Sequence, residues 1–519
     1  MTKLALLSNI NIDPVKNFLN KENRYEIYVS GYNQWHADLV NSASALYSFK
    51  PDFVFVYLDA TELNNQVSDL FSAVEIYSKP FPTVQFIISN LSFPPYQIQT
   101  YIQNSYQIQV KLNIGLMEFQ KKSTGFFIFD FNRLISLHGY NQLFNDKFWY
   151  LGRIKLSNAG FRIMAAELIN VINCLEGKTK KVLVVDLDNT LWGGIVGEDG
   201  WNHLIVSEEG TGRIYSDFQK NLVKLSETGV ILAIASKNNE NDVIEAFEKN
   251  NNFKIALKQF VAKKINWQNK ADNIAEIAKE LNVGINSTVF IDDNKLEREL
   301  VKEALPEVVV PEFPHDITTL NYWFINEVVY PWFGKKTLTS EDSSKTEQYS
   351  RNNEREKESK LFSYKEFLDN LKIKLNIEKA NESSIPRISQ LTQKTNQFNL
   401  SVKRYSELEI TEMSKAPNYL VLSLIYEDKF GNEGITGVSI IKIDEKAATL
   451  DSFLLSCRIL GRKVEFSFMD YIISELKDLN IKTLSALYTK TEKNGQVQKF
   501  LSNFGFFTSN NEKYQIKIQ

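Results

Sequence analysis

Short apolar runs separated by polar segments recur along the whole chain, and most of them have the length of a β-strand. In the first ~175 residues, such runs alternate with stretches of helical or loop character. The runs are Leu4–Leu7, Tyr25–Val29, Phe53–Leu58, Val84–Ile88 and Phe126–Phe129. Alternation of this kind is typical of a parallel sheet covered by helices. We therefore predict an α/β domain over residues 1–175.

Further apolar runs, in the middle of the chain, lead directly into polar residues. The runs and the residues that follow them are Val182–Val185 with Asp186, Val230–Ala235 with Ser236, and Ser287–Ile291 with Asp292 and Asp293. Between the second and third runs, Lys270 opens a segment with apolar residues at helical spacing. The carboxyl ends of parallel strands meet at one edge of a sheet, where ligands bind. We therefore predict that these polar side chains converge on one site.

The first of these strands leads into the motif Asp186-x-Asp188-x-Thr190. Two carboxylates at a sheet edge need a cation to neutralise them, and hard oxygen ligands suit Mg²⁺, which completes its shell with water and substrate phosphate. The motif alone is short, and a surface loop in which Asp188 or Asn189 caps a turn would also explain it. The order strand–Asp, strand–Ser, Lys–helix, strand–Asp-Asp is more specific. It closely resembles the haloacid dehalogenase (HAD) phosphatase superfamily.

That resemblance, together with the chemistry of phosphoryl transfer, implies roles for the residues. Asp186 is expected to attack phosphorus and form an aspartyl-phosphate, and Asp188 to donate and later accept a proton. Ser236 and Lys270 are expected to hold the phosphoryl oxygens; Lys264 competes with Lys270, but Lys270 starts a helix, whose N–H groups also face an anion. Further residues expected to bind phosphate, or to support its loop, are Thr190, Lys237 and Asn238. The expected Mg²⁺ ligands are Asp186, the main-chain carbonyl of Asp188, Asp293 directly and Asp292 through water.

Length and composition limit what else the chain is expected to do. A chain of 519 residues is too long for a single hydrophobic core, and we expect about three domains. Its 60 basic and 63 acidic residues give a net charge of −3, with no basic excess for nucleic acid and no charged tail for a membrane. Only Cys174 and Cys457 occur, so neither a disulfide framework nor a zinc site is expected. With no signal peptide and no membrane-length apolar run, the expected location is cytoplasmic.

The second half of the chain predicts a linker and another domain. The HAD-like domain is expected over residues 179–338, and the hydrophilic stretch 339–360 is interpreted as an exposed helical linker outside any core. Beyond it, three consecutive strands precede a long helix, which favours a mixed α+β domain over residues 361–519. The expected elements are Ile373–Ile377, Ile385–Asn396, Leu420–Tyr426, Thr436–Ile443, Ala448–Leu455, Val464–Leu479, Leu484–Tyr488 and a short helix ending at Phe504. Their order is like that of GNAT-type acyltransferases.

Four phrases in the chain resemble the FkbH-type proteins, and the resemblance covers nearly the whole sequence. They are DLDNTLWGGIVGEDG (186–200), FIDDNKLERE (290–299), LTQKTNQFNL (391–400) and SCRILGRKVE (456–465). Members of that family combine a HAD phosphatase with a GNAT-like domain. The resemblance implies a Mg²⁺-dependent glyceryltransferase–phosphatase that captures a three-carbon acid from 1,3-bisphosphoglycerate and removes its phosphate. The product is delivered as a glyceryl thioester to an acyl carrier protein, for polyketides and related acylated metabolites.

The same resemblance points to residues in the C-terminal domain. Cys457 lies just after a predicted strand, near where GNAT folds open their acyl cleft, and basic neighbours make it a candidate nucleophile. The alternative is a small buried apolar residue. The residues expected to bind the acyl or pantetheine group are Arg458, Gly461, Arg462, Lys394 and Asn396. Lys463 takes the last small position of the Arg-x-x-Gly-x-Gly/Ala phosphate loop. A lysine tolerates right-handed helical backbone there, but its side chain hinders the close approach of a pyrophosphate. A single phosphate is easier to house, which favours a phosphopantetheine arm over acetyl-CoA.

The N-terminal domain resembles an SGNH-hydrolase-like or flavodoxin-like fold. Ser8 follows the first strand, where a nucleophile can sit, but the Asp-x-x-His expected near the domain end is missing from LSNAGF (156–161). A serine without a base is a poor nucleophile. We therefore predict a structural or docking domain without catalysis.

Two other functions are compatible with these patterns. One is a HAD phosphatase of a phosphosugar or phosphoprotein fused to an N-acyltransferase. The other is a scaffold protein with a vestigial HAD site. The intact set of six polar residues weighs against the scaffold, because drift would erode some of them; the set is Asp186, Asp188, Ser236, Lys270, Asp292 and Asp293.

Overall fold

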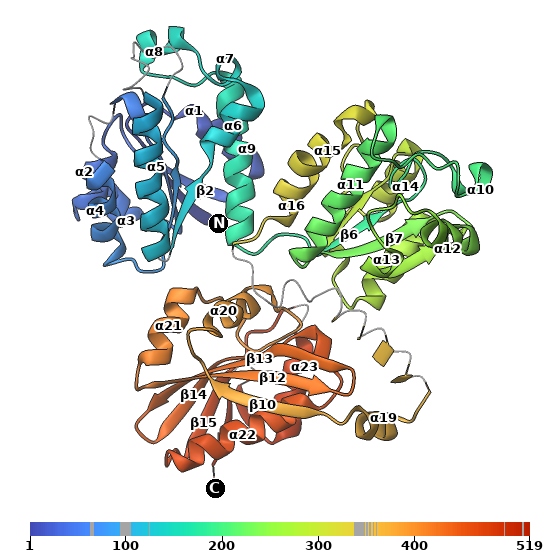
Figure 1. Cartoon of the computed structure of the whole chain (residues 1–519). Helices are drawn as coiled ribbons and strands as arrows, with labels where there is room; N and C mark the ends of the chain where they lie inside the picture. Colours follow the sequence, from blue (N-terminus) through green and yellow to red (C-terminus); the bar gives the residue numbers. More distant parts are fainter. Residues whose placement is uncertain are drawn as a thin grey trace. The chain divides into compact units, whose positions relative to one another are not determined.

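The computed structural model of the chain divides into two compact units, Met1–Asn173 and Cys174–Gln519. The first unit contains one sheet and the second contains two (Figure 1). The structure describes all residues except 63–66, 94–104, 124, 337–347, 349–350, 352–353, 356–357, 360, 492–493, 511–512 and 519. No helix in this described part of the chain is long and apolar enough to cross a membrane. The α/β class is confirmed, while the domain boundaries inferred from the sequence stay predictions.

The first unit is built on a five-stranded parallel sheet with the strand order β2-β1-β3-β4-β5. Its strands are β1 (Thr2–Ser8), β2 (Tyr25–Val29), β3 (Phe53–Tyr57), β4 (Gln85–Ser89) and β5 (Phe126–Phe129). Its helices are α1 (Pro14–Leu19), α2 (Trp35–Val40), α3 (Ala45–Phe49), α4 (Val67–Ser78), α5 (Ser105–Lys122), α6 (Phe131–His138), α7 (Tyr140–Leu143), α8 (Asp146–Gly152) and α9 (Asn158–Leu175). All the predicted strands are present, because their apolar side chains form the buried faces of the sheet.

Ser8, at the carboxyl end of β1, is buried and hydrogen-bonded to the main chain. It is 3% exposed, and its Oγ accepts a hydrogen bond from the main-chain N–H of Ile10 at 3.1 Å. The neighbouring Asn9 side chain bonds to the main-chain N–H and carbonyl of Asp59, at 2.8 and 2.9 Å. These bonds join the loops after β1 and β3, and the absence of catalysis in this domain stays a prediction.

The second unit begins with a central domain, which is built on a four-stranded parallel sheet in the order β8-β7-β6-β9. Its strands are β6 (Val182–Val185), β7 (Ile231–Ser236), β8 (Phe260–Ile265) and β9 (Thr288–Ile291). Its helices are α10 (Val196–Asp199), α11 (Gly210–Glu227), α12 (Glu240–Lys249), α13 (Lys270–Glu280), α14 (Lys295–Ala304), α15 (Leu320–Trp323) and α16 (Tyr330–Phe333). Strand β8 was not predicted, because Lys263 and Lys264 interrupt its buried apolar run.

The C-terminal domain is built on an eight-stranded sheet in the order β10-β12-β13-β14-β15-β17-β16, with β11 paired to β14 outside this path. Its strands are β10 (Lys374–Lys379), β11 (Phe398–Asn399), β12 (Tyr419–Asp428), β13 (Gly431–Asp444), β14 (Ala447–Leu455), β15 (Thr483–Leu487), β16 (Phe507–Asn510) and β17 (Lys513–Lys517). Its helices are α19 (Tyr364–Leu371), α20 (Ile385–Lys394), α21 (Glu407–Lys415), α22 (Val464–Asp478) and α23 (Gly495–Phe504). Three antiparallel strands precede the long helix α22, as the sequence predicts.

Strands β14 and β15 separate partway along their length. They pair in parallel only over the first part of β14, from Ala447 to Leu450. Beyond that point β11 pairs with β14 instead, with Phe398 opposite Leu455 and Asn399 opposite Leu454. The opening between the two strands is therefore filled by the chain itself.

Two further sets of hydrogen bonds hold β11 in this opening. The N–H of Leu400 donates to the carbonyl of Phe453 at 2.9 Å, and the N–H of Thr489 donates to the carbonyl of Leu400 at 3.0 Å. The fully buried Asn494 donates from Nδ2 to the carbonyls of Asn399 and Thr489, at 2.9 and 2.8 Å. The segment is thus tied to both sides of the opening.

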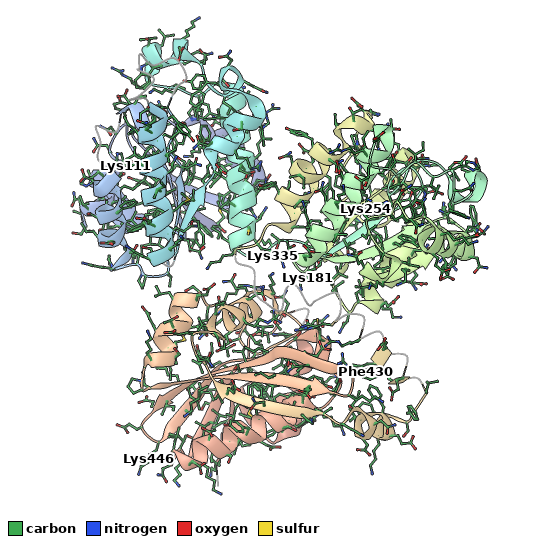
Figure 2. The ribbon with its side chains drawn as sticks, viewed as in Figure 1. Lys111, Lys181, Lys254, Lys335, Phe430 and Lys446 are labelled. Carbon is green, nitrogen blue, oxygen red and sulfur yellow. The ribbon has the colours of Figure 1, made fainter. Side chains whose placement is uncertain are left out.

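The interpretation of residues 339–360 as an exposed linker is wrong at Gln348 and Arg355, which are buried, whereas Glu354 and Ser359 are exposed as expected. Arg355 is 2% exposed and makes two 2.7 Å hydrogen bonds to the carboxylate of Asp428 and one to Glu433. Its guanidinium group lies over the ring of Phe430, 5.3 Å from the centroid (Phe430 is labelled in Figure 2). Gln348 is buried as well. A hydrophilic pattern cannot distinguish a solvated charge from one whose partners lie about 75 residues away in sequence.

Candidate active site

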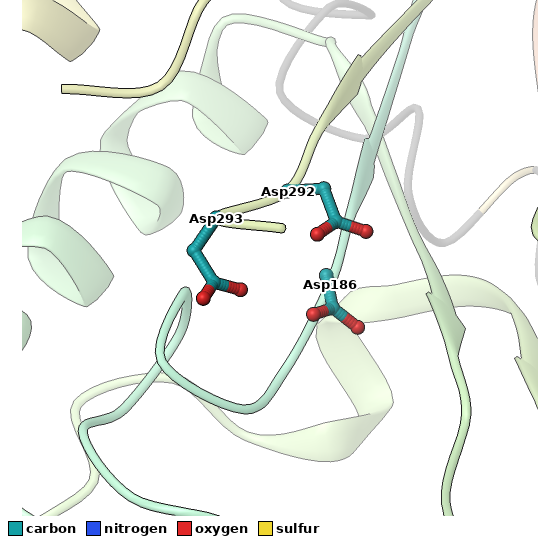
Figure 3. Close-up of side chains that lie close together, drawn as sticks. All are labelled: Asp186, Asp292 and Asp293. Carbon is teal, nitrogen blue, oxygen red and sulfur yellow. The ribbon is translucent and has the colours of Figure 1, made fainter. Parts of the chain in front are cut away.

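The carboxyl edge of the central sheet brings together the acidic residues singled out in the sequence. Strand β6 lies between β7 and β9, so Asp186, which follows β6, leaves the sheet beside Asp292 and Asp293, which follow β9. One carboxylate oxygen from each of the three residues lies within 4.8 Å of the others. Figure 3 shows the three side chains turned toward a shared space. Asp186 and Asp292 are buried, and Asp293 is partly exposed.

Lys270 supplies positive charge to this cluster. Its Nζ lies 2.9 Å from Asp186 Oδ1 and 2.6 Å from Asp292 Oδ2. Lys270 is the first residue of α13, and Asn269 caps this helix by accepting a hydrogen bond from the N–H of Ala271. Burial lowers the pKa of Lys270, but the charges of Asp186 and Asp292 outweigh burial and hold its pKa above the ordinary value. The ammonium group therefore stays protonated beside both carboxylates.

Of the two lysines considered from the sequence, Lys270 is the one beside the aspartates. Lys264 instead pairs with Glu276 and Glu280, at 2.8 and 3.6 Å, on the surface of α13. Those acidic partners raise the pKa of Lys264 in spite of its partial burial. Lys264 therefore serves as a matched surface control for Lys270.

The electrostatics of the cluster suit a divalent cation. Burial and the charge of Asp186 raise the pKa of Asp292 to about 7, and the same two causes raise the pKa of Asp293. Three carboxylates face a single lysine, so another cation at this place reduces their mutual repulsion. Hard oxygen donors at this spacing are the ligands that Mg²⁺ prefers. The side chains of Asp186, Asp292 and Asp293 therefore fit a Mg²⁺ ion.

Asp188 is held in place by three hydrogen-bond donors. Trp192 Nε1 and the main-chain N–H of Val196 donate to its Oδ1, at 2.9 and 3.0 Å. Asn238 Nδ2 donates to its Oδ2 at 2.9 Å. Among the described residues, the cluster of three carboxylates does not include the side chain of Asp188. The metal contact predicted for Asp188 is therefore left to its main-chain carbonyl. Sequence reasoning missed the contribution of Trp192, whose ring is fully buried in the core.

Ser236 and Asn238 lie together at the end of β7. Asn238 Nδ2 donates to Ser236 Oγ at 3.1 Å and also bonds to Asp188, so its amide joins the loops after β6 and β7. Lys237, predicted to bind phosphate, forms an ion pair with Glu297 at 2.6 Å, and its side chain is 35% exposed. Asn238 therefore positions Asp188 and Ser236. The ammonium group of Lys237 is paired with a glutamate of α14.

Thr190 supports the loop that carries the acidic pair. It is fully buried, and its Oγ1 accepts a hydrogen bond from the N–H of Asp293 at 3.0 Å. The same hydroxyl lies 3.3 Å from Asp293 Oδ1. Of the two uses expected for Thr190, loop support is the one that its contacts favour.

Arg298 is a supporting residue that sequence reasoning missed. Its Nη1 donates to the main-chain carbonyls of Asp292 and Asp293, at 2.9 and 2.7 Å, and the residue is 3% exposed. A second bond joins its Nη2 to Glu312 at 3.1 Å. In the sequence, Arg298 lies three positions before Val301, so both residues fall on the same buried face of α14. This spacing was the signal that could have revealed it. A charged residue at an apolar helix position indicates a buried partner.

In the C-terminal domain, Cys457 follows β14 and is partly buried. Arg458 donates to Ser456 Oγ at 3.3 Å and to Gln348, and it lies 3.4 Å from Glu433. Both of the arginines that were expected to bind pantetheine phosphate have acidic neighbours: Arg462 lies 3.8 Å from Asp428 and over the ring of Tyr426. Each of these arginines therefore already has a carboxylate nearby, and the phosphate-binding role of the two arginines stays a prediction.

Other residues of the predicted loop differ from expectation in their backbone. Lys463 has φ 59° and ψ 17°, which is left-handed, whereas right-handed backbone was expected. Gly461 also has positive φ, at 76°. A left-handed lysine costs about 1–2 kcal/mol that glycine at the same position avoids. Lys394 ends α20, and Asn396 Oδ1 accepts a hydrogen bond from Arg404 at 3.0 Å.

The fold and this site define a class of protein: an α/β protein whose central sheet carries an aspartate cluster with a buried lysine at its carboxyl edge. Neither a scan against protein-family models nor a search of curated proteins gives a match. A solved structure does match. It is the N-terminal part of the protein BF1531 from Bacteroides fragilis, which contains a phosphatase domain and was crystallised in complex with Mg.

This chain is 31% identical to that structure and matches it with a TM-score of 0.58, over 65% of this chain and 95% of the other. The chain therefore belongs to the family of the phosphatase-domain protein BF1531.

Shorter likenesses involve acetyltransferases. The ribosomal-protein-S18-alanine N-acetyltransferase from Escherichia coli matches with 15% identity and a TM-score of 0.23, over 28% of this chain and 95% of its own. A GNAT-family acetyltransferase from Staphylococcus aureus matches with 17% identity and the same TM-score, over 28% of this chain and 100% of its own. TM-scores this low do not bear on what the C-terminal domain does.

Proposed function

We propose that the central domain is a Mg²⁺-dependent phosphatase of the HAD type. The observation that supports this most strongly is the position of Lys270 between Asp186 and Asp292, with Asp293 completing a group of three carboxylates. Asp186 presents an oxygen nucleophile beside a fixed positive charge. Similarity to a phosphatase-domain structure crystallised with Mg adds to this proposal.

In the proposed reaction, Asp186 forms a bond to phosphorus while the bond from phosphorus to the leaving oxygen breaks. Asp188, oriented by its three donors, gives a proton to that leaving oxygen. Asp188 later takes a proton from a water whose oxygen bonds to phosphorus, while the bond from phosphorus to Asp186 breaks and inorganic phosphate leaves. Lys270 and Ser236 hold the phosphoryl oxygens. When bound by Asp186, Asp292 and Asp293, Mg²⁺ neutralises charge that builds up on those oxygens.

We further propose that the whole chain is an FkbH-type glyceryltransferase–phosphatase that acts with an acyl carrier protein. The phrases that carry the resemblance include residues of the described site, among them Asp186, Asp188 and Asp293. The chemistry is economical: an acyl phosphate such as 1,3-bisphosphoglycerate already carries an activated acyl group, so a thiol takes it without ATP. Cys457 is the proposed acyl-accepting thiol. The phosphatase centre then removes only the remaining phosphate ester.

The two alternative functions are weaker. An N-acyltransferase that uses acetyl-CoA between β14 and β15 is disfavoured because Phe398–Leu400 fill that opening. A scaffold with a vestigial site is disfavoured because the buried contacts among Asp186, Lys270 and Asp292 are complete and costly to maintain without function.

The test is to incubate the protein with Mg²⁺, 1,3-bisphosphoglycerate and a holo acyl carrier protein, and to measure the intact mass of the carrier. The proposal predicts a glyceryl adduct. Asp186→Asn should leave the phosphoglyceryl adduct in place, and Cys457→Ala should prevent loading. Lys270→Gln should abolish dephosphorylation, while Lys264→Gln, its matched surface control, should not.

Absence of any adduct with every carrier tested would favour the phosphatase fused to an N-acyltransferase. Loading that survives Cys457→Ala would show direct transfer from the acyl phosphate to the carrier. Hydrolysis of small phosphate esters by the Lys270→Gln variant at the wild-type rate would contradict the phosphatase centre itself.

A further inference from the structure

A cavity of about 700 Å³ lies within the second unit, away from the aspartate cluster. Eight basic residues and one acidic residue, Glu176, line it. Lys178 pairs with Glu176 at 2.7 Å and Arg458 lies 3.4 Å from Glu433, and the other basic residues include Lys394 and Arg404. Lys181 and Lys335, labelled in Figure 2, belong to the same lining. Cys457 also lines this cavity. The cavity therefore combines a large excess of positive charge with a thiol.

Two of these cations are held by uncharged oxygen atoms. Arg404 donates to Asn396 Oδ1 at 3.0 Å and to the carbonyl of Thr392 at 3.4 Å. Lys180 Nζ donates to the carbonyl of Asn286 at 2.6 Å. These bonds satisfy donors without neutralising the charges. Burial lowers the pKa of Arg404 and of Lys180, as expected for cations that are partly removed from water.

The cavity also provides the access to Cys457. On the sheet side, the opening between β14 and β15 is closed by the buried residues Phe398, Asn399 and Leu400. On the cavity side, Asn396 and Gln397 lie on the wall together with Cys457. A ligand that reaches the thiol of Cys457 therefore approaches through this cavity, past its basic side chains.

This cavity is separate from the proposed phosphatase centre. Its central-domain wall contains Lys181 and Ser287, which precede β6 and β9, whereas Asp186 and Asp292 follow these strands. The two places thus lie at opposite edges of the central sheet. Lys181 and Asp186 are five positions apart, a span of roughly 16 Å in extended chain. A phosphate bound in the cavity is not the one attacked by Asp186.

We propose that this cavity is a second anion site, which binds an organic phosphate and presents the attached acyl group to Cys457. The inference rests on the acyl transfer proposed above and names the place where the phosphorylated acyl group binds. The shared chemistry is a phosphate dianion on a flexible carbon chain. Such a group belongs either to the acyl phosphate donor or to a phosphopantetheine arm.

With an acyl phosphate, the sulfur of Cys457 forms a bond to the acyl carbon, and the bond from that carbon to the phosphate oxygen breaks. The electron pair leaves with inorganic phosphate, which takes up the thiol proton directly or through water. Basic side chains such as Lys394 and Arg404 stabilise the departing dianion. The phosphate ester at the other end of the acyl group remains for the aspartate centre.

The separation of the two sites imposes an order. The strand from the cavity wall at Lys181 to Asp186 alone spans roughly 16 Å, which a cysteine side chain carrying a three-carbon acyl group does not bridge. The acyl group must therefore leave Cys457, on the carrier's longer arm, before Asp186 removes the remaining phosphate.

The test measures alkylation of Cys457 in the full-length chain, in a Cys174→Ser background, by mass spectrometry. Iodoacetate is an anion and iodoacetamide is neutral, so the ratio of their rates reports the local potential, and the neutral rate controls for folding. We expect the ratio at Cys457 to exceed that of a free cysteine peptide. Lys394→Gln with Arg404→Gln should lower it about fivefold, as for two charges within a Debye length. Lys446→Gln, in the exposed turn between β13 and β14 (Figure 2), should leave it unchanged.

Protection experiments then identify the source of the phosphate. 3-Phosphoglycerate should slow alkylation if the donor binds here, and pantetheine 4′-phosphate should slow it if the carrier's arm binds here. Protection by either supports the site. A thiol that does not react, a rate ratio equal to that of the free peptide, or no protection by either compound overturns the inference. Phosphatase activity that persists in such a protein would leave the function of the aspartate centre intact.

Discussion

Removing the guanidinium group of Arg355 should destabilise the C-terminal domain strongly, although a hydrophilic sequence surrounds this residue. Arg355→Ala leaves the carboxylates of Asp428 and Glu433 buried without the three 2.7 Å bonds that compensate them. Both acidic side chains are at most 1% exposed, so water cannot replace the arginine. Loss of one partner from a buried ion pair costs about 3–5 kcal/mol, a large share of the 5–15 kcal/mol that is typical of a domain.

Hydrogen exchange measured by mass spectrometry is the suitable assay, because all seven tryptophans precede residue 333 and fluorescence does not report on this domain. Peptides from β12 and β13 should exchange about 10²–10³ times faster in Arg355→Ala, since 1.4 kcal/mol corresponds to a factor of ten. The matched control is Arg213→Ala on α11; the Arg213 side chain is 66% exposed and its Nε lies 3.5 Å from Asp217. Its effect should stay below about 0.5 kcal/mol.

The same pair has a defined pH dependence. Burial raises the pKa of Asp428, but the hydrogen bonds and charge of Arg355 outweigh burial and hold its pKa below the ordinary value. A depressed pKa adds stability above the unfolded-state pKa of about 3.9, and this stability is lost as the pH falls through the folded-state pKa. The difference between wild type and Arg355→Ala should therefore shrink below about pH 4. If Arg355→Ala at pH 7 changes exchange no more than Arg213→Ala does, the buried pair does not stabilise the domain.

Three further predictions concern separate parts of the chain. Mg²⁺ at a hundred times its dissociation constant should stabilise the central domain by about 2.7 kcal/mol, seen as a higher midpoint in tryptophan fluorescence, and Asp293→Asn should remove most of that gain. Lys463→Gly should raise the free energy of unfolding by about 0.5–1 kcal/mol and so raise the denaturation midpoint, because glycine tolerates the left-handed backbone; a lower midpoint would mean that the lysine side chain stabilises the loop. Asn494→Ala removes two donated hydrogen bonds and those that its Oδ1 accepts from Thr491 and Tyr488, and it should cost about 2–3 kcal/mol. Unchanged hydrogen exchange in Phe398–Leu400 would contradict this.

Where a strand or helix has a regular apolar pattern, the sequence predicted it well. Tyr25–Val29 and Phe126–Phe129 were placed to the residue, and α13 begins at Lys270 as expected. Periodicity works here because each of these elements buries a face of its own. Strand β8 was missed because its exposed lysines break the pattern at the edge of the sheet. The two-residue strand β11 is too short to have a pattern at all.

The sequence predicted which residues belong to the candidate site, but not which atoms those residues contact. Asp186, Lys270 and the acidic pair could be named because each follows a strand or opens a helix. The roles of Trp192 and Arg298 could not, since their partners are a carboxylate and carbonyl groups whose positions depend on the loop conformation. Arg355 shows the same limit more clearly, because its partners are separated from it by more than 70 residues.

By itself, the sequence determined the α/β class, the strands that end in aspartate or serine, and the expectation that these residues share one sheet edge. Only the tertiary structure decided that Lys270 and not Lys264 meets the carboxylates, and that Phe398–Leu400 close the opening beside β14. It also placed Cys457 on a cationic wall. The physical reason is that local patterns report which face of an element is buried, whereas charge partners and cavities arise between elements that are distant in the chain.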